Sequence, residues 1–222
     1  MSTWAVLAAA GRGNRLGAER PKAFVRLGRR PLLAESLERL EASEWIDAIV
    51  VVVPSGWEEP AILLAEELGC GKVTASVAGG QTRTESVAAG LAEVSADAAA
   101  VVVHDAARPL VSDDVIKRVL VRLGDGCVGV VPGLAPADTL KRVRGDTVVE
   151  TLARQELVAV QTPQAFVAEA LRDAFAALGP RDISDCASVV EARGGSIRVV
   201  AGDPRLLKVT TPADLELVTS WL

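Results

Sequence analysis

The sequence predicts an α/β fold: a doubly wound, Rossmann-like, mostly parallel sheet with a protruding β-hairpin arm. Three observations predict this class. Several apolar runs are continuous rather than alternating, as in parallel strands that helices cover on both faces. Helical patterns separate these runs as far as about residue 133, which is the alternation of a doubly wound sheet. The pattern then changes to alternating apolar and polar residues, which is typical of a hairpin.

The continuous apolar runs are the strands expected in the parallel part of the sheet, at residues 4–10, 48–54, 98–104 and 127–132. Helical patterns predict helices over residues 32–42, 57–69, 82–94, 112–124, 165–178, 184–193 and 212–222. A further strand is expected at residues 196–201.

Residues 138–156 alternate apolar and polar side chains, with Gly145 and Asp146 at the middle. A tight turn at these two residues would join two antiparallel strands, so the stretch predicts a hairpin that projects from the core. We therefore expect one domain over residues 1–222, with the arm at about residues 136–158.

Composition predicts a globular protein, since 50% of the residues are hydrophobic and 24% are charged, and the cysteine usage favours the cytoplasm. The three cysteines, Cys70, Cys127 and Cys186, follow no metal-binding spacing and are expected to be reduced thiols. No apolar run approaches the roughly 20 residues of a membrane span, and no targeting signal is visible. We expect no membrane partner.

The net charge of −5 is unevenly placed. Residues 11–30 contain seven cations and one acid, a local charge of +6. One concentrated basic segment in an acidic protein suits a small polyanion better than a DNA duplex, which needs a broad basic face. Aromatic residues make up 3% of the chain and leave little for bases to stack on, so we expect no nucleic-acid partner.

The stretch AAAGRGNRLGAERPK (residues 8–22) combines glycines with cations directly after the first predicted strand. No G-K-[ST] follows Gly11 to make a P-loop, and Leu16 stands where a dinucleotide fingerprint needs its third glycine. The charges of Arg15 and Lys22 suit a triphosphate whose bridging bond is broken, because negative charge grows there in the transition state. A solvated basic turn is the alternative.

The stretch VVVHDAARP (residues 101–109) ends a buried strand at Asp105, at the carboxyl end where α/β sheets place their ligands. One carboxylate there can hold Mg²⁺, or another divalent cation, together with substrate phosphates. Arg108 is close enough in sequence to contact the same anion, whereas His104 is expected to be a hydrogen-bonded structural residue. An aspartate that caps the following turn is the alternative.

The stretch AGGQTRTESVAAGL (residues 78–91) places two glycines before a predicted helix. Gly79 and Gly80 would allow close approach of a flat base or ribose, and Arg83 and Ser86 would supply hydrogen bonds. A turn followed by a capped helix explains the same residues without a ligand.

Six segments then occur in order from the first strand to the last helix: LAAAGRGNRLGAERPK, AGGQTRTESV, VHDAARP, ADTLKR, QTPQ and LKVTTPADL. Together they resemble the 2-C-methyl-D-erythritol 4-phosphate cytidylyltransferase family, which uses CTP in the non-mevalonate isoprenoid pathway. The resemblance implies that the phosphate of methylerythritol phosphate attacks the α-phosphate of CTP and that pyrophosphate leaves.

The resemblance also implies a role for each matching residue. Arg15 and Lys22 would stabilise the transition state, and Asp105 would hold Mg²⁺. The CTP pocket would be lined by Ala9, Ala10, Gly11, Gly80, Arg83, Ser86 and Ala106. The polyol phosphate would meet Arg108, Thr139, Arg154, Thr162, Ser184 and Lys208. A homodimer is implied, in which the arm reaches a neighbour and Thr139 and Arg154 serve the partner's site.

The chain departs from the family pattern at four of these places. Gln81 stands where an acid is usual, Ala153 where Asp is usual, Ser184 where Thr is usual and Leu206 where Asn is common. These changes affect the expected base contacts and the polyol phosphate site, and none touches Arg15, Lys22 or Asp105.

Four alternatives remain open, and one of them is a guanylyl- or thymidylyltransferase, which the segment VHDAARP fits poorly. A ribitol-5-phosphate cytidylyltransferase would share the loop, Asp105 and CTP, and would differ in the polyol pocket. An NAD(P)-binding oxidoreductase would need a third loop glycine and an acid after the second strand, where this chain has Leu16 and Pro54. A non-catalytic nucleotide-binding module would keep the fold without requiring Arg15, Lys22 and Asp105 to converge.

Overall fold

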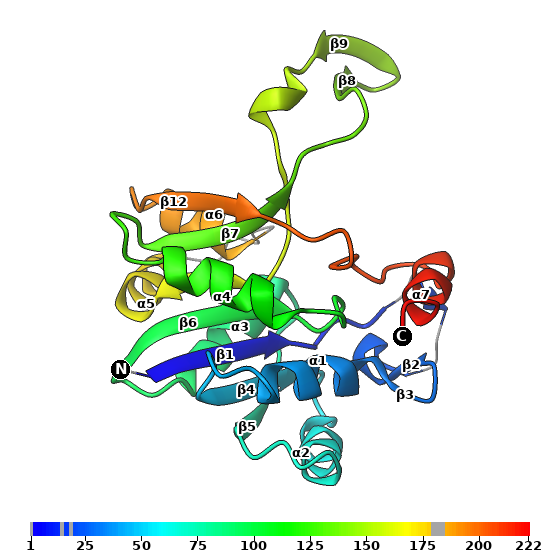
Figure 1. The fold of residues 1–222 in the computed structure, drawn as a ribbon, viewed down its shortest axis with the longest axis vertical. Helices are drawn as coiled ribbons and strands as arrows, with labels where there is room; N and C mark the ends of the chain where they lie inside the picture. Colours follow the sequence, from blue (N-terminus) through cyan, green and yellow to red (C-terminus); the bar gives the residue numbers. More distant parts are fainter. Residues whose placement is uncertain (1, 14–15, 18–19, 179–184) are drawn as a thin grey trace.

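The computed structural model describes residues 2–13, 16–17, 20–178 and 185–222. Eight strands in these residues form the main sheet, and they are β1 (Ser2–Ala8), β4 (Ala48–Val53), β5 (Val73–Ala78), β6 (Ala98–Asp105), β7 (Gly129–Leu134), β10 (Ala159–Val160), β11 (Gln164–Val167) and β12 (Ile197–Ala201). Figure 1 shows this sheet through the middle of the molecule.

The sheet is mostly parallel, as the sequence predicts. Its order is β10-β7-β11-β6-β1-β4-β5, with β12 paired to β7. Strands β5, β4, β1 and β6 are parallel to one another, and β12 is parallel to β7. Strand β11 is antiparallel to both of its neighbours, β6 and β7, and β10 is antiparallel to β7.

Helices cover both faces of the sheet, which makes the fold doubly wound. Helices α1 (Leu32–Glu41), α2 (Glu58–Glu67) and α4 (Asp113–Arg122) pack on one face, and α3 (Arg83–Ala92), α5 (Ala168–Ala176) and α6 (Cys186–Glu191) pack on the other. Successive strand residues alternate between the two cores, so Leu7 lies in the first and Val6 in the second. Burial on both faces explains why the strands are continuous apolar runs.

A smaller apolar cluster lies beside this sheet. The 3₁₀ helix η2 (Lys22–Phe24) leads into a short hairpin of β2 (Arg26–Leu27) and β3 (Arg30–Pro31). Helix α7 (Pro212–Thr219) lies beside this hairpin (Figure 1), and its Val218 shares a cluster with Leu27 and Leu32. The cluster thereby joins the last helix to the segment that carries Lys22.

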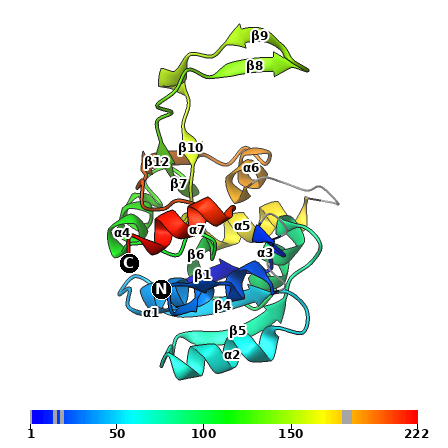
Figure 2. The ribbon, with the colours of Figure 1, turned by 90° about the vertical axis from the view of Figure 1, so that its right-hand side faces the viewer.

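The arm is an antiparallel hairpin that projects away from the sheet (Figures 1 and 2). Its strands β8 (Lys141–Arg144) and β9 (Thr147–Thr151) meet at a turn of Gly145 and Asp146, and the 3₁₀ helix η3 (Arg154–Glu156) follows. Gly145 has a φ of 62°, a left-handed conformation that favours glycine. The turn therefore lies where the sequence predicts it.

The structure corrects two of the predicted elements. The helix predicted from residue 165 begins at Ala168, because residues Gln164–Val167 form β11. Phe166 in that strand is fully buried, and the slot between β6 and β7 imposes the extended conformation. Strand β5 was absent from the prediction, since VTASVA mixes small and polar residues and lies half-exposed at the sheet edge.

Within the described ranges, no helix is long and apolar enough to cross a membrane.

Helix α3 approaches the sheet closely at Gly90, where a Cβ would lie 2.6 Å from Val6 Cγ1 and 2.7 Å from Val52 Cγ2. Gly90→Ala gains about 1 kcal/mol of helix propensity. We nevertheless expect it to lower the free energy of unfolding by about 1–3 kcal/mol, because the added methyl overpacks the contact. Urea denaturation measures the change. Ala88→Gly, at an exposed position of the same helix, is the control and should lose only about 1 kcal/mol. A Gly90→Ala protein as stable as wild type would contradict the close packing.

Candidate active site

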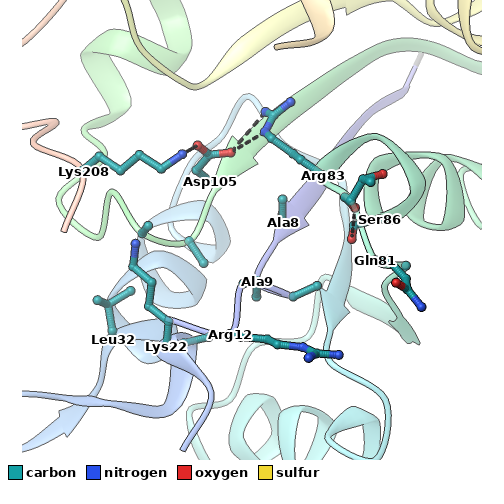
Figure 3. Close-up of a pocket in the computed structure, with 17 residues that line it drawn as sticks. Ala8, Ala9, Arg12, Lys22, Leu32, Gln81, Arg83, Ser86, Asp105 and Lys208 are labelled. Atoms are coloured by element: carbon teal, nitrogen blue, oxygen red, sulfur yellow. Dashed lines mark hydrogen bonds and ion pairs between the residues drawn. The ribbon is translucent and has the colours of Figure 1, made fainter. Parts of the chain in front are cut away.

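A cavity of about 270 Å³ lies at the carboxyl ends of β1 and β6 (Figure 3). Its walls come from the segments that follow β1, β5 and β6, with Lys22, Leu32 and Lys208 from other parts of the chain. The lining residues are Ala8, Ala9, Ala10, Gly11, Arg12, Lys22, Ala23, Leu32, Gly80, Gln81, Thr82, Arg83, Ser86, Asp105, Ala106, Ala107 and Lys208. Open α/β sheets bind their ligands at this end of the strands.

The segment after β1 folds back so that Lys22 reaches this cavity. The backbone N–H of Lys22 donates to the carbonyl oxygen of Gly11 at 3.3 Å. Gly13 has a φ of 72°, and a Cβ there would lie 2.8 Å from Lys22 Cβ. Both the left-handed backbone and the close approach therefore require glycine at position 13. In Figure 3, Lys22 extends toward the side of the cavity that holds Asp105, whereas Arg12 extends the other way.

Asp105 is paired with two cations from distant parts of the chain. Arg83 Nε donates to Oδ1 at 3.1 Å, and Lys208 Nζ donates to Oδ2 at 2.6 Å (Figure 3). Burial by itself would raise the pKa of Asp105, but the charges of Arg83 and Lys208 outweigh it and hold that pKa well below its ordinary value. The carboxylate is therefore ionised at neutral pH.

Asp105 is also the residue expected to hold Mg²⁺. In the part of the chain that the structure describes, no group of three His, Cys, Asp or Glu side chains is placed to hold a metal ion. A carboxylate has about four lone-pair sites, so Arg83 and Lys208 leave some of them available. Asp105 thus fits a Mg²⁺ that takes its remaining ligands from phosphate oxygens and water, which is the usual way that proteins bind this ion.

A second cavity, of about 340 Å³, adjoins the first. The two cavities share Arg83, Asp105 and Lys208, so these paired side chains form a common wall. The remaining lining residues of the second cavity are Arg108, Val160, Gln161, Thr162, Gln164 and Asp185. Two anionic ligands, one in each cavity, would meet beside the same three charges.

Arg108 brings a buried positive charge to the second cavity. Its Nη1 donates to the carbonyl oxygen of Leu206 at 2.6 Å. Its buried Nε has no hydrogen-bond partner among the described residues. Burial lowers the pKa of Arg108, but an arginine keeps its charge at neutral pH. Arg108 therefore adds a positive charge to a cavity that Arg83 and Lys208 also line, which suits an anion there.

Hydrogen bonds determine which nitrogen of His104 carries the proton. Nε2 lies 3.1 Å from the carbonyl oxygen of Arg108, which can only accept, so Nε2 is the protonated nitrogen. Nδ1 then accepts from the Thr162 hydroxyl at 3.1 Å, and that hydroxyl accepts from the Asp105 N–H at 3.0 Å. His104 is therefore a buried structural residue, and the Thr162 hydroxyl holds the end of β6.

The structure brings most of the predicted site residues together. All seven residues predicted for the CTP pocket line the first cavity, with Lys22 and Asp105. The predicted polyol phosphate residues Arg108, Thr162 and Lys208 line the second cavity. Thr139 and Arg154 are exposed, lie in the arm region and line neither cavity. Arg15 and Ser184 fall outside the described residues. The binding roles of these residues stay predictions.

The two glycines after β5 make room for protein atoms. A Cβ at Gly79 would lie 2.4 Å from Ala10 Cβ, and a Cβ at Gly80 would lie 2.2 Å from Glu85 Cβ. Thr82 and Glu85 form the capping box that starts α3. The immediate effect of the glycines is thus to let this loop pack against the loop after β1 and against α3.

Sequence reasoning missed four residues of the second cavity, Val160, Gln161, Gln164 and Asp185. The Gln161 side-chain amide bonds both the N–H and the C=O of Asp203, at 3.0 and 2.9 Å. The Gln164 amide donates to Asp185 Oδ2 and accepts from the Cys186 N–H, each at 3.2 Å. Two polar residues beside Thr162 in the segment QTPQ, ahead of a buried apolar run, were the available signal.

A family model for 2-C-methyl-D-erythritol 4-phosphate cytidylyltransferase matches residues 3–222. The chain belongs to this family. A curated 2-C-methyl-D-erythritol 4-phosphate cytidylyltransferase of Nocardia farcinica is 45% identical over 222 residues, covering 100% of this chain and 94% of the relative. The enzyme of that name from Rhodococcus jostii is 46% identical over 214 residues, covering 96% and 92%. The crystal structure of the Thermus thermophilus enzyme of the same name superposes with a TM-score of 0.79 at 33% identity, covering 97% and 96%. The family resemblance seen in the six segments is confirmed.

Because His104 is buried as a neutral imidazole, we expect the protein to lose stability in mild acid. Burial lowers the pKa of its imidazole from an ordinary 6.5 to about 4, so the unfolded chain takes up a proton before the folded protein does. The contribution of His104 to stability is therefore complete above pH 6.5 and is lost as the pH falls toward 4. Between pH 7 and pH 5 the loss is on the order of 2 kcal/mol.

His104→Gln keeps an amide donor for the Arg108 carbonyl and cannot be protonated. Its free energy of unfolding should therefore change less than that of the wild type between pH 7 and pH 5, as measured by urea denaturation. The same pH dependence in both proteins would show that His104 is not held neutral in the fold.

Proposed function

We propose that the protein transfers CMP from CTP to 2-C-methyl-D-erythritol 4-phosphate. The products would be 4-(cytidine 5′-diphospho)-2-C-methyl-D-erythritol and pyrophosphate, in the non-mevalonate isoprenoid pathway. The observation that carries the proposal is the pair of adjoining cavities that meet at Arg83, Asp105 and Lys208. CTP would occupy the first cavity and the polyol phosphate the second, in a chain that belongs to the family named for this reaction.

The reaction needs positioning and charge neutralisation rather than a covalent intermediate. A phosphate oxygen of the acceptor attacks the α-phosphorus of CTP, the bond from that phosphorus to the bridging oxygen breaks, and pyrophosphate leaves with the electron pair. Holding the two anions in line supplies much of the rate acceleration. Lys22 and Arg15 would stabilise the negative charge of the five-coordinate phosphorus. Arg108 and Lys208, which both line the second cavity, would hold the acceptor phosphate.

A divalent cation would assist at the shared wall of the cavities. We propose that Asp105 holds Mg²⁺, whose charge reduces the repulsion between the two anionic substrates when it is bound. We also propose that the protein acts in the cytoplasm, because Cys70, Cys127 and Cys186 are buried thiols without a disulfide.

We propose a homodimer formed through the arm at about residues 136–158. Val143, Val148 and Val149 on the hairpin strands are 57%, 55% and 50% exposed, and an isolated hairpin of this kind is only marginally stable in water. Thr139 and Arg154 line neither cavity of their own protomer. Placing the arm against a second copy would cover the valines and bring Thr139 and Arg154 to the partner's acceptor site.

Pyrophosphate release should be fastest with CTP and 2-C-methyl-D-erythritol 4-phosphate, when four nucleoside triphosphates are tested against a panel of polyol phosphates. The panel includes ribitol 5-phosphate, the acceptor of the alternative enzyme. Fastest turnover with that acceptor, or with another nucleotide, would overturn the assignment.

Lys22→Ala and Arg15→Ala should each lower kcat by about 100-fold or more, because each removes a positive charge that we propose stabilises the transition state. Arg20→Ala is the matched control, since it removes a cation from the same loop at an exposed position that does not line the cavity. Steady-state kinetics with CTP and the acceptor measure all three variants. Wild-type turnover in Lys22→Ala and Arg15→Ala would exclude the proposed mechanism.

Mixing two inactive variants tests whether the arm serves the partner's site. In a mixed dimer of Lys22→Ala and Arg154→Ala, one site would combine an intact Lys22 with an intact Arg154 from the other protomer. We therefore expect the equimolar mixture to recover about a quarter of wild-type activity after subunit exchange. A mixture of Lys22→Ala and Asp105→Asn, both in the body of the protomer, should recover none. No recovery with Arg154→Ala would place Arg154 in its own protomer's site, and an active Arg154→Ala protein would place it outside the reaction.

A further inference from the structure

The second cavity is assembled from segments that are far apart in the sequence, and Gln161 joins two of them. The residue is buried, at 5% exposure, and its backbone N–H donates to the carbonyl oxygen of Pro132 in β7 at 2.8 Å. Its side chain meets the backbone of Asp203 twice. Nε2 donates to the Asp203 carbonyl oxygen at 2.9 Å, and Oε1 accepts from the Asp203 N–H at 3.0 Å. This two-point contact ties the segment after β12 to the sheet.

The tied segment leads directly to the cations of the cavity. The Leu206 N–H donates to the Asp203 carbonyl oxygen at 2.9 Å, which closes a turn. The Leu206 carbonyl oxygen accepts from Arg108 Nη1 at 2.6 Å. Two residues further on, Lys208 Nζ donates to Asp105 Oδ2 at 2.6 Å. The position of the turn from Asp203 to Leu206 therefore decides where both cationic side chains lie.

Packing leaves the Gln161 amide little freedom. A Cβ at Gly202 would lie 2.4 Å from Gln161 Oε1 and 3.0 Å from the carbonyl oxygen of Gly133. The Gly202 N–H donates to that same carbonyl at 2.9 Å. Since the amide lies against backbone on this side, it cannot turn away from Asp203 without losing both hydrogen bonds.

We propose that Gln161 is a positioning residue that sets Arg108 and Lys208 for an anion in the second cavity. The proposal rests on the proposed function, in which this anion is the phosphate of the acceptor. A glutamine suits the role because its amide both donates and accepts, as a backbone peptide does. Of the two cations, Arg108 lines the second cavity alone and Lys208 lines both, so Gln161 affects binding of the acceptor more than binding of CTP.

Two substitutions test whether Gln161 positions Arg108 and Lys208 or only stabilises the fold. Gln161→Met keeps the length of the side chain and loses both hydrogen bonds to Asp203. Gln161→Glu keeps the acceptor for the Asp203 N–H but faces a carboxylate oxygen toward the Asp203 carbonyl. Each should raise the KM for 2-C-methyl-D-erythritol 4-phosphate by about 10-fold or more, because hydrogen bonds that orient two cations are lost. The KM for CTP should rise by a smaller factor, because of these two cations only Lys208 lines the first cavity.

Hydrogen exchange gives a second readout that does not depend on turnover. The backbone amides of residues 203–209 should exchange faster in both variants, while those of β1, β4 and β6 remain protected. Ser43→Ala is the matched control, because Ser43 is also a buried polar residue, at 1% exposure, and lines neither cavity. It removes a hydrogen bond to Asp113 and should lower stability without changing either KM.

A double-mutant cycle shows whether Gln161 acts through Lys208. Gln161→Met should raise the KM for the acceptor by a smaller factor in a Lys208→Met background than in the wild type. If Gln161→Met raised the KM for the acceptor by the same factor in both backgrounds, Gln161 would not act through Lys208.

The remaining outcomes also decide the proposal. An unchanged KM for the acceptor in a folded variant, or an equal rise of both KM values, would overturn it. Unfolding of both variants would overturn it as well, because Gln161 would then support the whole fold. A wild-type protein that releases no pyrophosphate from CTP with this acceptor contradicts the proposed function instead. In that case the hydrogen-exchange comparison still shows whether Gln161 holds the turn.

Discussion

The arrangement of the site depends on two ion pairs, in which Asp105 meets Arg83 and Lys208. A buried carboxylate without partners would be strongly destabilising, so the end of β6 requires cations from elsewhere in the chain. Arg83 comes from the first turn of α3, and Lys208 from the segment before α7. Meeting at one carboxylate, they close the common wall of both cavities. The requirements of burial and of ligand binding are thus met by the same three side chains.

The parallel part of the fold was predictable because a continuous run of apolar residues indicates a strand that is buried on both faces. AIVVVV in β4 is buried at every position, and a short run of this kind is typical of a parallel strand covered by helices on both faces. Strand β11 was not predictable in this way. Its residues continue into an apolar pattern that also fits a helix, and the choice is made by pairing with β6 and β7. Tertiary contacts override local preference there.

The residues of the candidate site also differ in whether the local sequence could predict them. Asp105 was predictable because the carboxyl end of a buried strand is where α/β sheets bind ligands. Gln161 was not, because its partner Asp203 is 42 residues away and no local pattern relates the two. The bond from Arg108 to Leu206 spans 98 residues. The sequence therefore shows which side chains can do the chemistry, whereas the side chains that hold them in place emerge only from the fold.

The position of β11 has a consequence for biosynthesis. Every described strand that pairs with β7, namely β10, β11 and β12, lies later in the chain than β7 itself. Residues 2–105 contain β1, β4, β5 and β6, which pair with one another, so this half of the sheet can form early on the ribosome. Strand β7 can join this half of the sheet only through β11, which lies between β6 and β7 and ends at Val167. Until Val167 has left the exit tunnel, the edge of β6 therefore stays unpaired. Nascent chains of intermediate length therefore expose an apolar edge strand, the kind of surface that chaperones protect.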